Sequence, residues 1–360
     1  MVFRQCYLEV ICSIMAKATH NVIDLFCGCG GFSLGFERAG FHVLLGIDVW
    51  KDALTTFTYN HKSSQVLQAD LSNLSPSETQ PLLKGNSVDV IIGGPPCQGF
   101  SVAGKRIVDD VRNKLYKNFV NFVSFYKPKA FVMENVPNIL SIGGGAVREE
   151  ILKDFSELGY TVEFRILTAS DYGVPQNRRR AIFVGFHNGH HFVFPDPLYS
   201  DKVTAEEAIS DLPEQSLDDG AAYPFESHSL YQEQMRSRSS GVYNHQATVH
   251  NDKTKRIISL VPDGGNYKDL PIDLQGTRKM HIAWTRLNSK KPSFTIDTGH
   301  RHHFHYSYNR IPTARESARI QSFPDNFIFT CSKTSQLKQI GNAVPPLLGE
   351  AIAKSLLEQL

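Results

Sequence analysis

The sequence predicts an α/β fold in which a doubly wound, mostly parallel sheet is joined to a second, smaller and irregular domain. Up to Phe186, short runs of β-branched and apolar residues alternate with stretches of helical apolar spacing, the pattern of a parallel sheet covered on both faces. Glycine or acidic residues follow the ends of several of these runs. Between residues 195 and 310, Pro and Gly breaks replace the regular alternation, so this stretch is predicted to form the irregular domain.

Each predicted element has a local signal. Residues 21–26 (NVIDLF) form the first strand, the glycine turn CGCGG follows, and residues 32–40 have helical spacing with Ser33 as the expected cap. The later elements, in chain order, are a strand at 43–47 that ends in Asp48, a helix at 53–59, strands at 66–68, 88–92, 130–133 and 181–184, and helices at 313–319 and 346–360. Ligands of such a sheet are expected at the carboxyl ends of its strands.

The last helix is expected to pack back on the first domain. We therefore assign residues 17–215 together with 341–360 to the first domain, and residues 216–340 to the second domain and a hinge. Residues 1–16 are interpreted as an N-terminal extension, because the first clear strand begins only at Asn21 and translation can begin at Met15. Deleting residues 1–14 should then leave activity intact.

The composition is that of a globular protein in a reducing compartment. Of the 360 residues, 41% are hydrophobic and 21% are charged, and no apolar run approaches the length of a membrane span. The six cysteines include no CxxC pair, so neither a disulfide framework nor a structural zinc site is indicated. The histidine-rich stretch 299–305 has no acidic or cysteine companion at ligand spacing, and no metal site is predicted.

Basic residues are concentrated in the second domain. Residues 227–310 contain 13 Lys and Arg against 6 Asp and Glu, together with eight of the 14 histidines, whereas the net charge of the whole chain is only +2. A basic block on an otherwise acidic protein is typical of a protein with a polyanion partner. A merely solvated surface is the alternative.

One cysteine follows two glycines and two prolines in the stretch GGPPCQGFS, residues 93–101. The prolines fix φ and remove two N–H donors, so the turn after the strand at 88–92 can neither become a helix nor extend the sheet. Cys97 is therefore presented on a rigid turn. An isolated cysteine after a strand is more often a small buried apolar residue, and the other motifs must decide between these interpretations.

Three successive strand ends carry groups suited to a nucleoside. CGCGG follows a strand and opens a helix, which is the geometry for a nucleotide-like cofactor. It is not GxGxxG and it lacks the GK[ST] ending, so pyrophosphate binding is disfavoured. Asp48 could accept hydrogen bonds from ribose hydroxyls, and Asp70 could accept one from an exocyclic adenine amine. The three features together indicate an adenosine-containing cofactor without a phosphate cradle, and a plain tight turn is the alternative.

Two further motifs should face the same crevice as Cys97. Glu134 follows the strand at 130–133, and a carboxyl group buried near a thiol can stay protonated and act as an acid. In QNRRR, the alternation of the strand that follows places Arg178 and Arg180 on one face, where they could grip a base carbonyl or phosphates. The alternative for Glu134 is a helix cap or a salt bridge. The alternative for the arginines is a solvated strand edge.

The order of these motifs resembles the DNA (cytosine-5)-methyltransferase family, from about residue 22 to residue 351, with a variable region at about 185–309. The matching stretches are DLFCGCGGFSLGF, GGPPCQGFS, MENV, YGVPQNRRRAIFVGF, RESARIQSFPDNF and QIGNAVPP. Six ordered motifs make the match specific and favour a functional Cys97. The resemblance implies a Rossmann-like, S-adenosyl-L-methionine-dependent catalytic domain at 17–215 with 341–360, and a target-recognition domain at 216–340.

The resemblance also implies a mechanism. Cys97 would attack C6 of a cytosine flipped out of duplex DNA, and Glu134 would donate to N3 of the ring. Arg178 and Arg180 would orient the base through its O2 and the nearby backbone. C5 would then take the methyl group of S-adenosyl-L-methionine, leaving S-adenosyl-L-homocysteine as product, and loss of the C5 proton would expel the thiol.

The same matching implies two sets of binding residues. The cofactor pocket would be lined by Phe26, Gly28, Cys29, Gly30, Gly31, Asp48, Val49, Asp70, Leu71, Gly94, Pro96, Leu115, Asn342 and Ala343. Val49 is a departure, because family members can carry there an aromatic side chain that stacks on adenine. DNA contacts are expected from the loop at 102–113 and from the second domain, at Ser101, Lys105, Arg106, Arg112, Arg286 and Arg310.

Three alternatives differ in specific residues. An amino-methyltransferase would follow its Pro-Pro pair with an aromatic residue, where this chain has Cys97. The RNA-methylating (tRNA) branch of the family shares the nucleophile, but the variable region has no Cys-Phe-Thr tripeptide. A catalytically idle DNA-binding protein is disfavoured by the intact catalytic residues.

The predicted setting is a monomer that acts on double-stranded DNA in the cytoplasm of a prokaryote or for a phage, away from membranes. A companion restriction endonuclease that forms no stable complex with it is left open.

Overall fold

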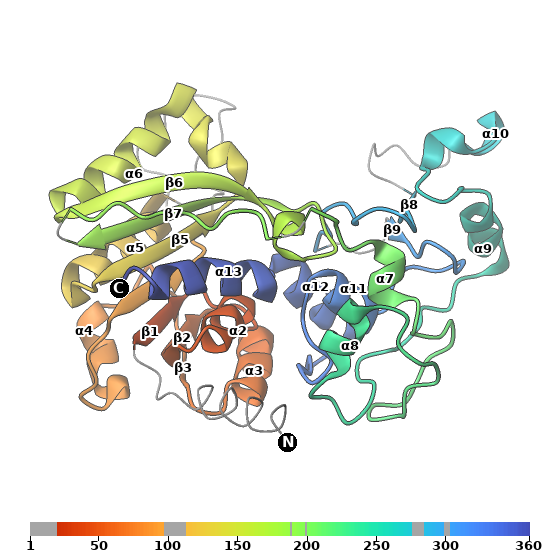
Figure 1. Ribbon diagram of the computed structural model, residues 1–360, viewed down its shortest axis with the longest axis horizontal. Helices are drawn as coiled ribbons and strands as arrows, with labels where there is room; N and C mark the ends of the chain where they lie inside the picture. The colour runs from red at the N-terminus through yellow and green to blue at the C-terminus, as the bar shows by residue number, and fades with distance from the viewer. Residues whose placement is uncertain (1–19, 97–112, 188, 199, 276–283, 299–302) are drawn as a thin grey trace, which may run out of the picture.

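A seven-stranded sheet organises the N-terminal half of the chain (Figure 1). The structure is a computed structural model that describes residues 20–96, 113–187, 189–198, 200–275, 284–298 and 303–360. The strand order is β3-β2-β1-β4-β5-β7-β6. The strands are β1 (Asn21–Leu25), β2 (His42–Asp48), β3 (Gln65–Gln68), β4 (Val90–Gly93), β5 (Ala130–Asn135), β6 (Tyr160–Thr168) and β7 (Arg179–His187). β1 to β5 pair in parallel, and β7 lies antiparallel between β5 and β6.

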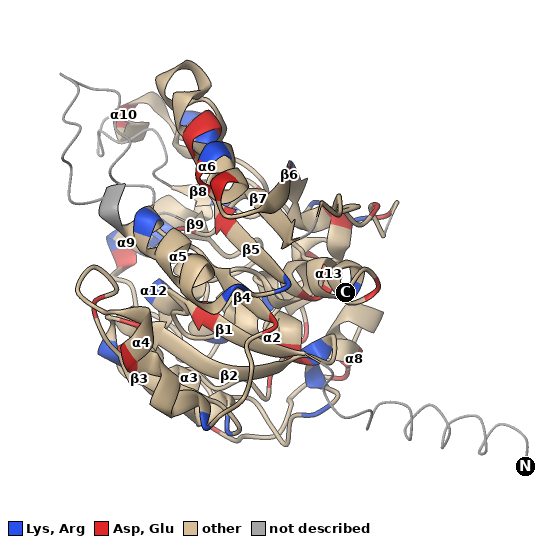
Figure 2. Cartoon of the chain, turned by 90° about the vertical axis from the view of Figure 1, so that its left-hand side faces the viewer, with Lys and Arg blue, Asp and Glu red and all other residues tan. Residues whose placement is uncertain are grey.

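The predicted doubly wound α/β sheet is confirmed, and its helices lie on both faces. Val90 and Ile92 pack on one side with α2 (Gly31–Arg38), α3 (Lys51–Asn60) and α13 (Pro346–Leu357). Ile91 faces the other side with α5 (Asn113–Tyr126) and α6 (Ala146–Glu157). Figure 2 shows α5 and α2 on opposite sides of the sheet, and it shows charges of both signs along α6. Successive residues of a strand point to opposite faces, so a strand covered on both sides must be apolar throughout.

β6 is absent from the predicted elements. Its sequence, YTVEFRILT, interrupts the apolar residues with Glu163 and Arg165, and most of its residues are only half-buried because it forms the edge of the sheet. A partly exposed edge strand lacks the continuous apolar run that identifies the central strands.

The last helix, α13, packs back on the first domain, as predicted, and two glycines allow its close approach to α2. A Cβ added at Gly35 of α2 would lie 2.7 Å from the backbone nitrogen of Glu350 in α13. Phe32 lies 3.1 Å from the corresponding position of Gly349. Arg38 also donates through Nε to Glu350 Oε2 at 2.6 Å. Any side chain at Gly35 would therefore separate the two helices.

The predicted helix cap at Ser33 is wrong. The N-cap of α2 is Gly30, whose φ is 95° and which makes no side-chain capping bond. Ser33 lies inside the helix, fully buried, and its hydroxyl donates to Asp24 Oδ2 of β1 at 2.6 Å. The hydroxyl is thus used to satisfy a buried carboxyl group and not the helix terminus.

The remainder of the described chain is built from short elements, which lie on the right of Figure 1. They are α7 (Ala205–Ile209), α8 (Leu230–Arg236), α9 (Asp252–Ser259), α10 (Ile272–Gln275), the two-stranded pair β8 (Thr285–Arg286) and β9 (His303–Phe304), α11 (Ala314–Ile320) and α12 (Lys333–Asn342). Two small apolar clusters, around Ile209 and around Ile258, support this region. Within the described ranges, no helix has the length and apolar character needed to cross a membrane.

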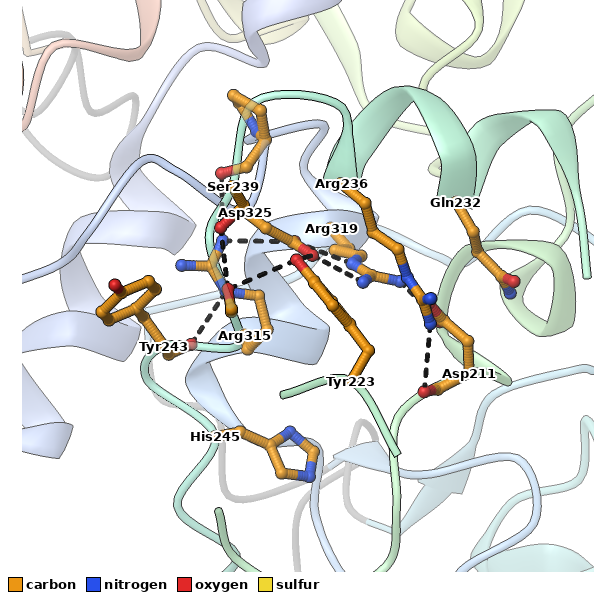
Figure 3. Close-up of polar contacts among 12 residues, drawn as sticks. Asp211, Tyr223, Gln232, Arg236, Ser239, Tyr243, His245, Arg315, Arg319 and Asp325 are labelled. Atoms are coloured by element: carbon orange, nitrogen blue, oxygen red, sulfur yellow. Dashed lines mark hydrogen bonds and ion pairs between the residues drawn. The ribbon is translucent and has the colours of Figure 1, made fainter. Parts of the chain in front are cut away.

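A buried ionic network joins α11 to α7 and to the loop after α11 (Figure 3). Arg319 donates to both oxygens of Asp325, at 2.8 and 2.6 Å, and to Asp211 Oδ1 at 2.5 Å. Tyr223 donates to Asp325 at 2.7 Å. Burial alone would lower the pKa of Arg319, but Asp325 and Asp211 raise it above its ordinary value. We call Arg315, Arg319, Asp211 and Asp325 the buried arginine network.

Candidate active site

The glycine turn after β1 lies where the order of the strands reverses, between β1 and β4, which is the usual ligand crevice of such a sheet. The turn is closed by Gly30 N donating to Cys27 O at 3.0 Å, and it is tied to β2 by Cys27 N donating to Ile47 O at 3.1 Å. Phe26, Gly28 and Gly30 have positive φ values of 59°, 55° and 95°. The chain therefore needs glycine at two of these positions.

Two glycines of this turn are also required by close packing. A Cβ at Gly30 would lie 2.1 Å from Nε2 of the buried His61, and a Cβ at Gly31 would lie 2.4 Å from Val344 O. His61 is held in turn by Glu37, with Nδ1 and Oε2 2.8 Å apart. The shape of the turn is thus fixed by α3 on one side and by the segment after α12 on the other.

Asp48, at the end of β2, is tied to the turn. Its Oδ2 accepts from Gly28 N at 2.9 Å, and its Oδ1 accepts from Trp50 N at 2.8 Å. Burial raises the pKa of Asp48, although these backbone donors act in the opposite direction. Each oxygen keeps a lone pair for another donor, so the carboxylate could both shape the loop and accept hydroxyl groups of a ligand.

The other predicted cofactor residues near β2 and β3 differ in exposure. Asp70 is exposed and accepts from Ser72 N at 2.9 Å. Val49 is 63% exposed, whereas Leu71 is only 3% exposed. Val49 therefore presents an apolar surface beside Asp48. Leu71 is buried in the apolar cluster on the α5 face of the sheet.

Glu134 and Arg180 meet at the ends of β5 and β7. Arg180 Nε lies 2.6 Å from Glu134 Oε1, and both side chains are 13% exposed. The two strands are antiparallel, with Glu134 opposite Ile182, so Arg180 is brought alongside by the register. The arrangement places a carboxyl group and a guanidinium group side by side at the ends of β5 and β7.

The segment that leads to Cys97 lies against this pair. A Cβ added at Gly94 would be 3.0 Å from Glu134 Oε2. Asn135 Nδ2 donates to Pro95 O at 2.8 Å in a buried hydrogen bond. Gly94 and Pro95 are thereby fixed beside Glu134, and Pro96 is exposed.

Arg178, unlike Arg180, contacts the end of α12 and not Glu134. It is 2% exposed, its Nη1 donates to Gly341 O at 3.0 Å, and among the described residues its Nε has no hydrogen-bond partner. Burial and the charge of Arg180 lower the pKa of Arg178 to about 9, although Glu134 raises it. The buried, exposed and half-buried positions of residues 178, 179 and 180 confirm the predicted alternation along this segment.

The remaining residues predicted to line the cofactor pocket differ in how exposed their side chains are. Asn342 is exposed and Ala343 half-buried at the end of α12. The Cys29 side chain is 2% exposed and packs in the cluster that contains Leu337 and Phe323, so only its backbone is available to the turn. Leu115 is half-buried on the first turn of α5.

Several predicted residues lie outside the described residues. These are Cys97, Ser101, Lys105, Arg106 and Arg112. In the ranges that the structure does describe, no group of three or more His, Cys, Asp or Glu side chains could hold a metal ion.

The prediction that Arg286 and Arg310 bind DNA is wrong. Arg286 is 5% exposed and donates to the carbonyls of Val261, Ile258 and His305 at 2.7, 2.5 and 3.0 Å. Arg310 is 4% exposed and donates from both Nη atoms to Glu316, each at 2.7 Å. Both guanidinium groups are saturated by the protein itself, so neither has a free donor for a phosphate.

Two residues near the site were not predicted from the sequence. Asp24 is 1% exposed, and burial raises its pKa to about 8 against the opposing hydrogen bond from Ser33. Asn135 holds Pro95, as described above. The available signal was a polar residue inside each otherwise apolar strand, in NVIDLF and in VMEN, because a buried polar group needs a specific partner.

Comparison with known proteins identifies the family. The sequence model described as C-5 cytosine-specific DNA methylase matches residues 20–358. The chain is 41% identical over 339 residues to the type II methyltransferase M1.HphI of Haemophilus parahaemolyticus, covering 93% of this chain and 86% of that protein. It is 40% identical over 370 residues to the type II methyltransferase M.DdeI of Desulfomicrobium norvegicum, covering 93% and 88%.

Solved structures agree with this assignment. A protein assigned as a DNA modification methyltransferase of an E. coli prophage superposes with a TM-score of 0.79 at 30% identity, over 94% of this chain and 99% of that one. The Spodoptera frugiperda DNMT2 structure has a TM-score of 0.64 at 16% identity, over 94% and 100%, and shares the fold. The chain belongs to the C-5 cytosine-specific DNA methylase family and is a DNA (cytosine-5)-methyltransferase.

Proposed function

We propose that Cys97 is the nucleophile of this methyltransferase and that Glu134, Arg178 and Arg180 bind the target cytosine. The observation that carries the proposal is the convergence of three strand ends. Gly94 and Pro95, which immediately precede the nucleophile segment, lie against Glu134 and Asn135, and Arg180 pairs with Glu134 at 2.6 Å. A nucleophile, an acid and a base-orienting cation would then share one crevice.

The residues at the ends of β1 and β2 fit S-adenosyl-L-methionine. The glycine turn leaves no phosphate cradle, and Asp48 keeps a lone pair on each oxygen after accepting its two backbone hydrogen bonds, which suits the two hydroxyl donors of a ribose. Asp70 is exposed for an amine donor. When bound, the cofactor would supply an electrophilic methyl group. Asn342 and Ala343 would close the same pocket from α12.

The chemistry assigned to the protein residues follows from the low reactivity of cytosine C5. The Cys97 thiolate adds to C6 and makes C5 nucleophilic, and Glu134 stabilises the resulting enamine by donating to N3. After C5 carries its new methyl group, loss of the C5 proton restores the double bond and expels the thiolate. Neither C6 nor C5 is accessible inside a stacked duplex, so the base must be flipped out at a cost of a few kcal/mol.

We further propose that the substrate is double-stranded DNA and that the enzyme acts as a monomer in the cytoplasm of a prokaryotic cell, as part of a restriction-modification system. The type II relatives named above support this setting. A companion endonuclease would recognise the same DNA without forming a stable complex. Residues 216–340 would supply target recognition, and residues 17–215 with 341–360 would supply catalysis.

The test uses duplex DNA in which the target cytosine is replaced by 5-fluorocytosine. Bisulfite sequencing of DNA from cells that express the protein first identifies the methylated sequence. Because fluorine cannot leave as a cation, elimination is blocked and the protein should remain covalently attached in the presence of S-adenosyl-L-methionine. Attachment is read as a band of retarded mobility on a denaturing gel.

Matched cysteine variants assign the attachment. Cys97→Ala should abolish it, whereas Cys331→Ala, which changes an exposed free cysteine, should leave it unchanged. Attachment that persists in Cys97→Ala would exclude the proposed nucleophile. Attachment to 5-fluorocytosine in transfer RNA, without attachment to the duplex, would favour the RNA-methylating branch.

A further inference from the structure

Two buried glutamine side chains connect the segments that surround the active site. Gln176 precedes Arg178 in the turn before β7, and Gln321 is the C-cap of α11. Both are 0% exposed. Gln176 Nε2 donates to Gln321 Oε1 and lies 3.4 Å from Ile320 O. No part of the proposed chemistry uses either side chain.

Gln176 holds a segment of the second domain. Its Oε1 accepts from Ile296 N at 3.1 Å. The neighbouring backbone pairs with the same segment, because Asn177 N donates to Ser293 O at 2.7 Å and Ser293 N donates to Pro175 O at 2.9 Å. Residues 293–296 are therefore fastened to the turn that carries the active-site arginines.

Gln321 holds the end of α12. Its Nε2 donates to Ile340 O at 3.2 Å and to Ala343 O at 2.7 Å. Both amide hydrogens are thus used, and the orientation of the amide is fixed because its oxygen must accept from Gln176. A side chain without these donors would leave buried carbonyls unsatisfied.

Residues 340–344, which Gln321 clamps, lie between the two halves of the active site. On one side, Val344 O lies 2.4 Å from the position of a Cβ at Gly31 in the cofactor turn. On the other side, Gly341 O accepts from Arg178 Nη1 at 3.0 Å. Gly341 also packs closely against Asp297, since a Cβ added at Gly341 would be 2.5 Å from Asp297 O. We call residues 340–344 the connecting segment.

We propose that Gln321 is a positioning residue that couples the cofactor site to the base site. By fixing the connecting segment, it sets the position of Arg178 relative to the glycine turn. A ligand that orders the turn would then also order Arg178, so binding of one substrate would strengthen binding of the other. This inference rests on the proposed role of Arg178 in holding the base.

The experiment measures the coupling directly. The Kd of a duplex oligonucleotide that carries the methylated sequence is determined by fluorescence anisotropy with and without saturating S-adenosyl-L-homocysteine. For the wild type, the ratio of the two values should be about fivefold or more, within the usual range of coupling. In Gln321→Met, which keeps the volume but removes the hydrogen bonds, the ratio should fall towards one. The kcat should fall about tenfold, since both hydrogen bonds that Gln321 donates to the connecting segment are lost, while the KM for S-adenosyl-L-methionine changes less than about threefold.

Gln339→Met is the matched control. Gln339 is 1% exposed on α12, and its side chain contacts Ser335 Oγ at 3.2 Å and Thr330 O at 3.4 Å, not the connecting segment. It should lose stability to a similar extent and keep the wild-type coupling ratio. Gln321→Asn keeps the amide on a side chain one methylene shorter and should give an intermediate ratio. It serves as the second variant if Gln321→Met does not fold.

The outcomes separate this inference from the proposed function. A wild type with a coupling ratio near one would overturn the inference, as would a Gln321 variant that retains the wild-type ratio. Failure of the wild type to form the 5-fluorocytosine adduct would instead overturn the role of Cys97. A wild type that forms the adduct, with Gln321→Met uncoupled and Gln339→Met coupled, would support both.

Discussion

Within the described residues, the arginines of the buried arginine network and Arg178 of the crevice are equally buried, but the protein satisfies their hydrogen-bond donors to different extents. In the buried arginine network, Arg315 donates from Nε, Nη1 and Nη2 to the carbonyls of Tyr243, Pro324 and Phe327 at 2.9, 3.1 and 2.8 Å. Arg319 is bound by two aspartates (Figure 3). In the crevice, Arg178 is equally buried but its Nε lacks a partner among the described residues.

The difference shows that residue type alone does not identify which arginines can bind a ligand. A saturated guanidinium group fixes neighbouring segments and has nothing left for a ligand, whereas a buried cation with an unused donor is a candidate binding group. Arg286 and Arg310 belong with the saturated group although they lie in the most basic part of the sequence. The contrast can be tested by substitutions that separate loss of activity from loss of stability.

The largest effect is expected for Glu134→Gln in the crevice. Removing the acid should slow methyl transfer about 10²–10⁴-fold, because Gln cannot deliver a proton to N3, while S-adenosyl-L-homocysteine binding is retained. Single-turnover methylation and calorimetry measure the two quantities. Glu163→Gln on β6, whose partner is the exposed His191, should behave as wild type. Equal losses in the two variants would contradict the assignment.

In the network, Arg319→Met should act on stability. It removes one buried cation from the carboxylates of Asp211 and Asp325, both 0% exposed, and leaves Asp211 with Arg236 and Asp325 with Arg315. Breaking a buried ion pair in this way costs about 3–5 kcal/mol. Urea denaturation at neutral pH measures the loss. The variant should retain methylation activity below its transition temperature. A folded, fully stable Arg319→Met would show that the network contributes little.

A smaller, pH-dependent effect is expected for Asp24→Asn. The pKa of Asp24 is raised from 3.8 to about 8 by burial, so the folded protein holds a proton that the unfolded chain releases above about pH 4. Stability from this group is complete below pH 4 and is lost as the pH rises to 8. Relative to the wild type, Asp24→Asn should therefore gain about 2–3 kcal/mol between pH 5 and pH 7. The free energy of unfolding of both proteins is measured at pH 5, 6 and 7. A difference between the two proteins that stays the same over this range would contradict the expectation.

The smallest effect is expected at an exposed cation of the basic block, residues 227–310. Lys255 on α9 is exposed, unlike Arg286 and Arg310. If the basic block contacts phosphates, Lys255→Ala should weaken binding of all DNA sequences about tenfold or less and lower the salt slope of log K by about 0.9. Anisotropy titrations at several salt concentrations test this. An unchanged slope would place α9 away from the DNA.

The central sheet could be predicted from the sequence because its signals are local. β4 and β5 are apolar throughout and end in glycine or polar residues, as strands covered on both faces must be. β6 could not be predicted in the same way, because an edge strand with Glu163 and Arg165 has no comparable run. The helix cap at Ser33 failed for a related reason, since its hydroxyl serves Asp24 on a neighbouring strand.

The sequence by itself determined the fold class, the family and which residue types could supply the chemistry, because motif order and hydrophobic spacing are written along the chain. Only the tertiary structure decided which cations are already saturated, that Asn135 holds Pro95, and that Gln176 and Gln321 join segments 145 residues apart. Hydrogen bonds between distant segments depend on orientation and burial, and neither quantity is encoded in the residue types of one segment alone.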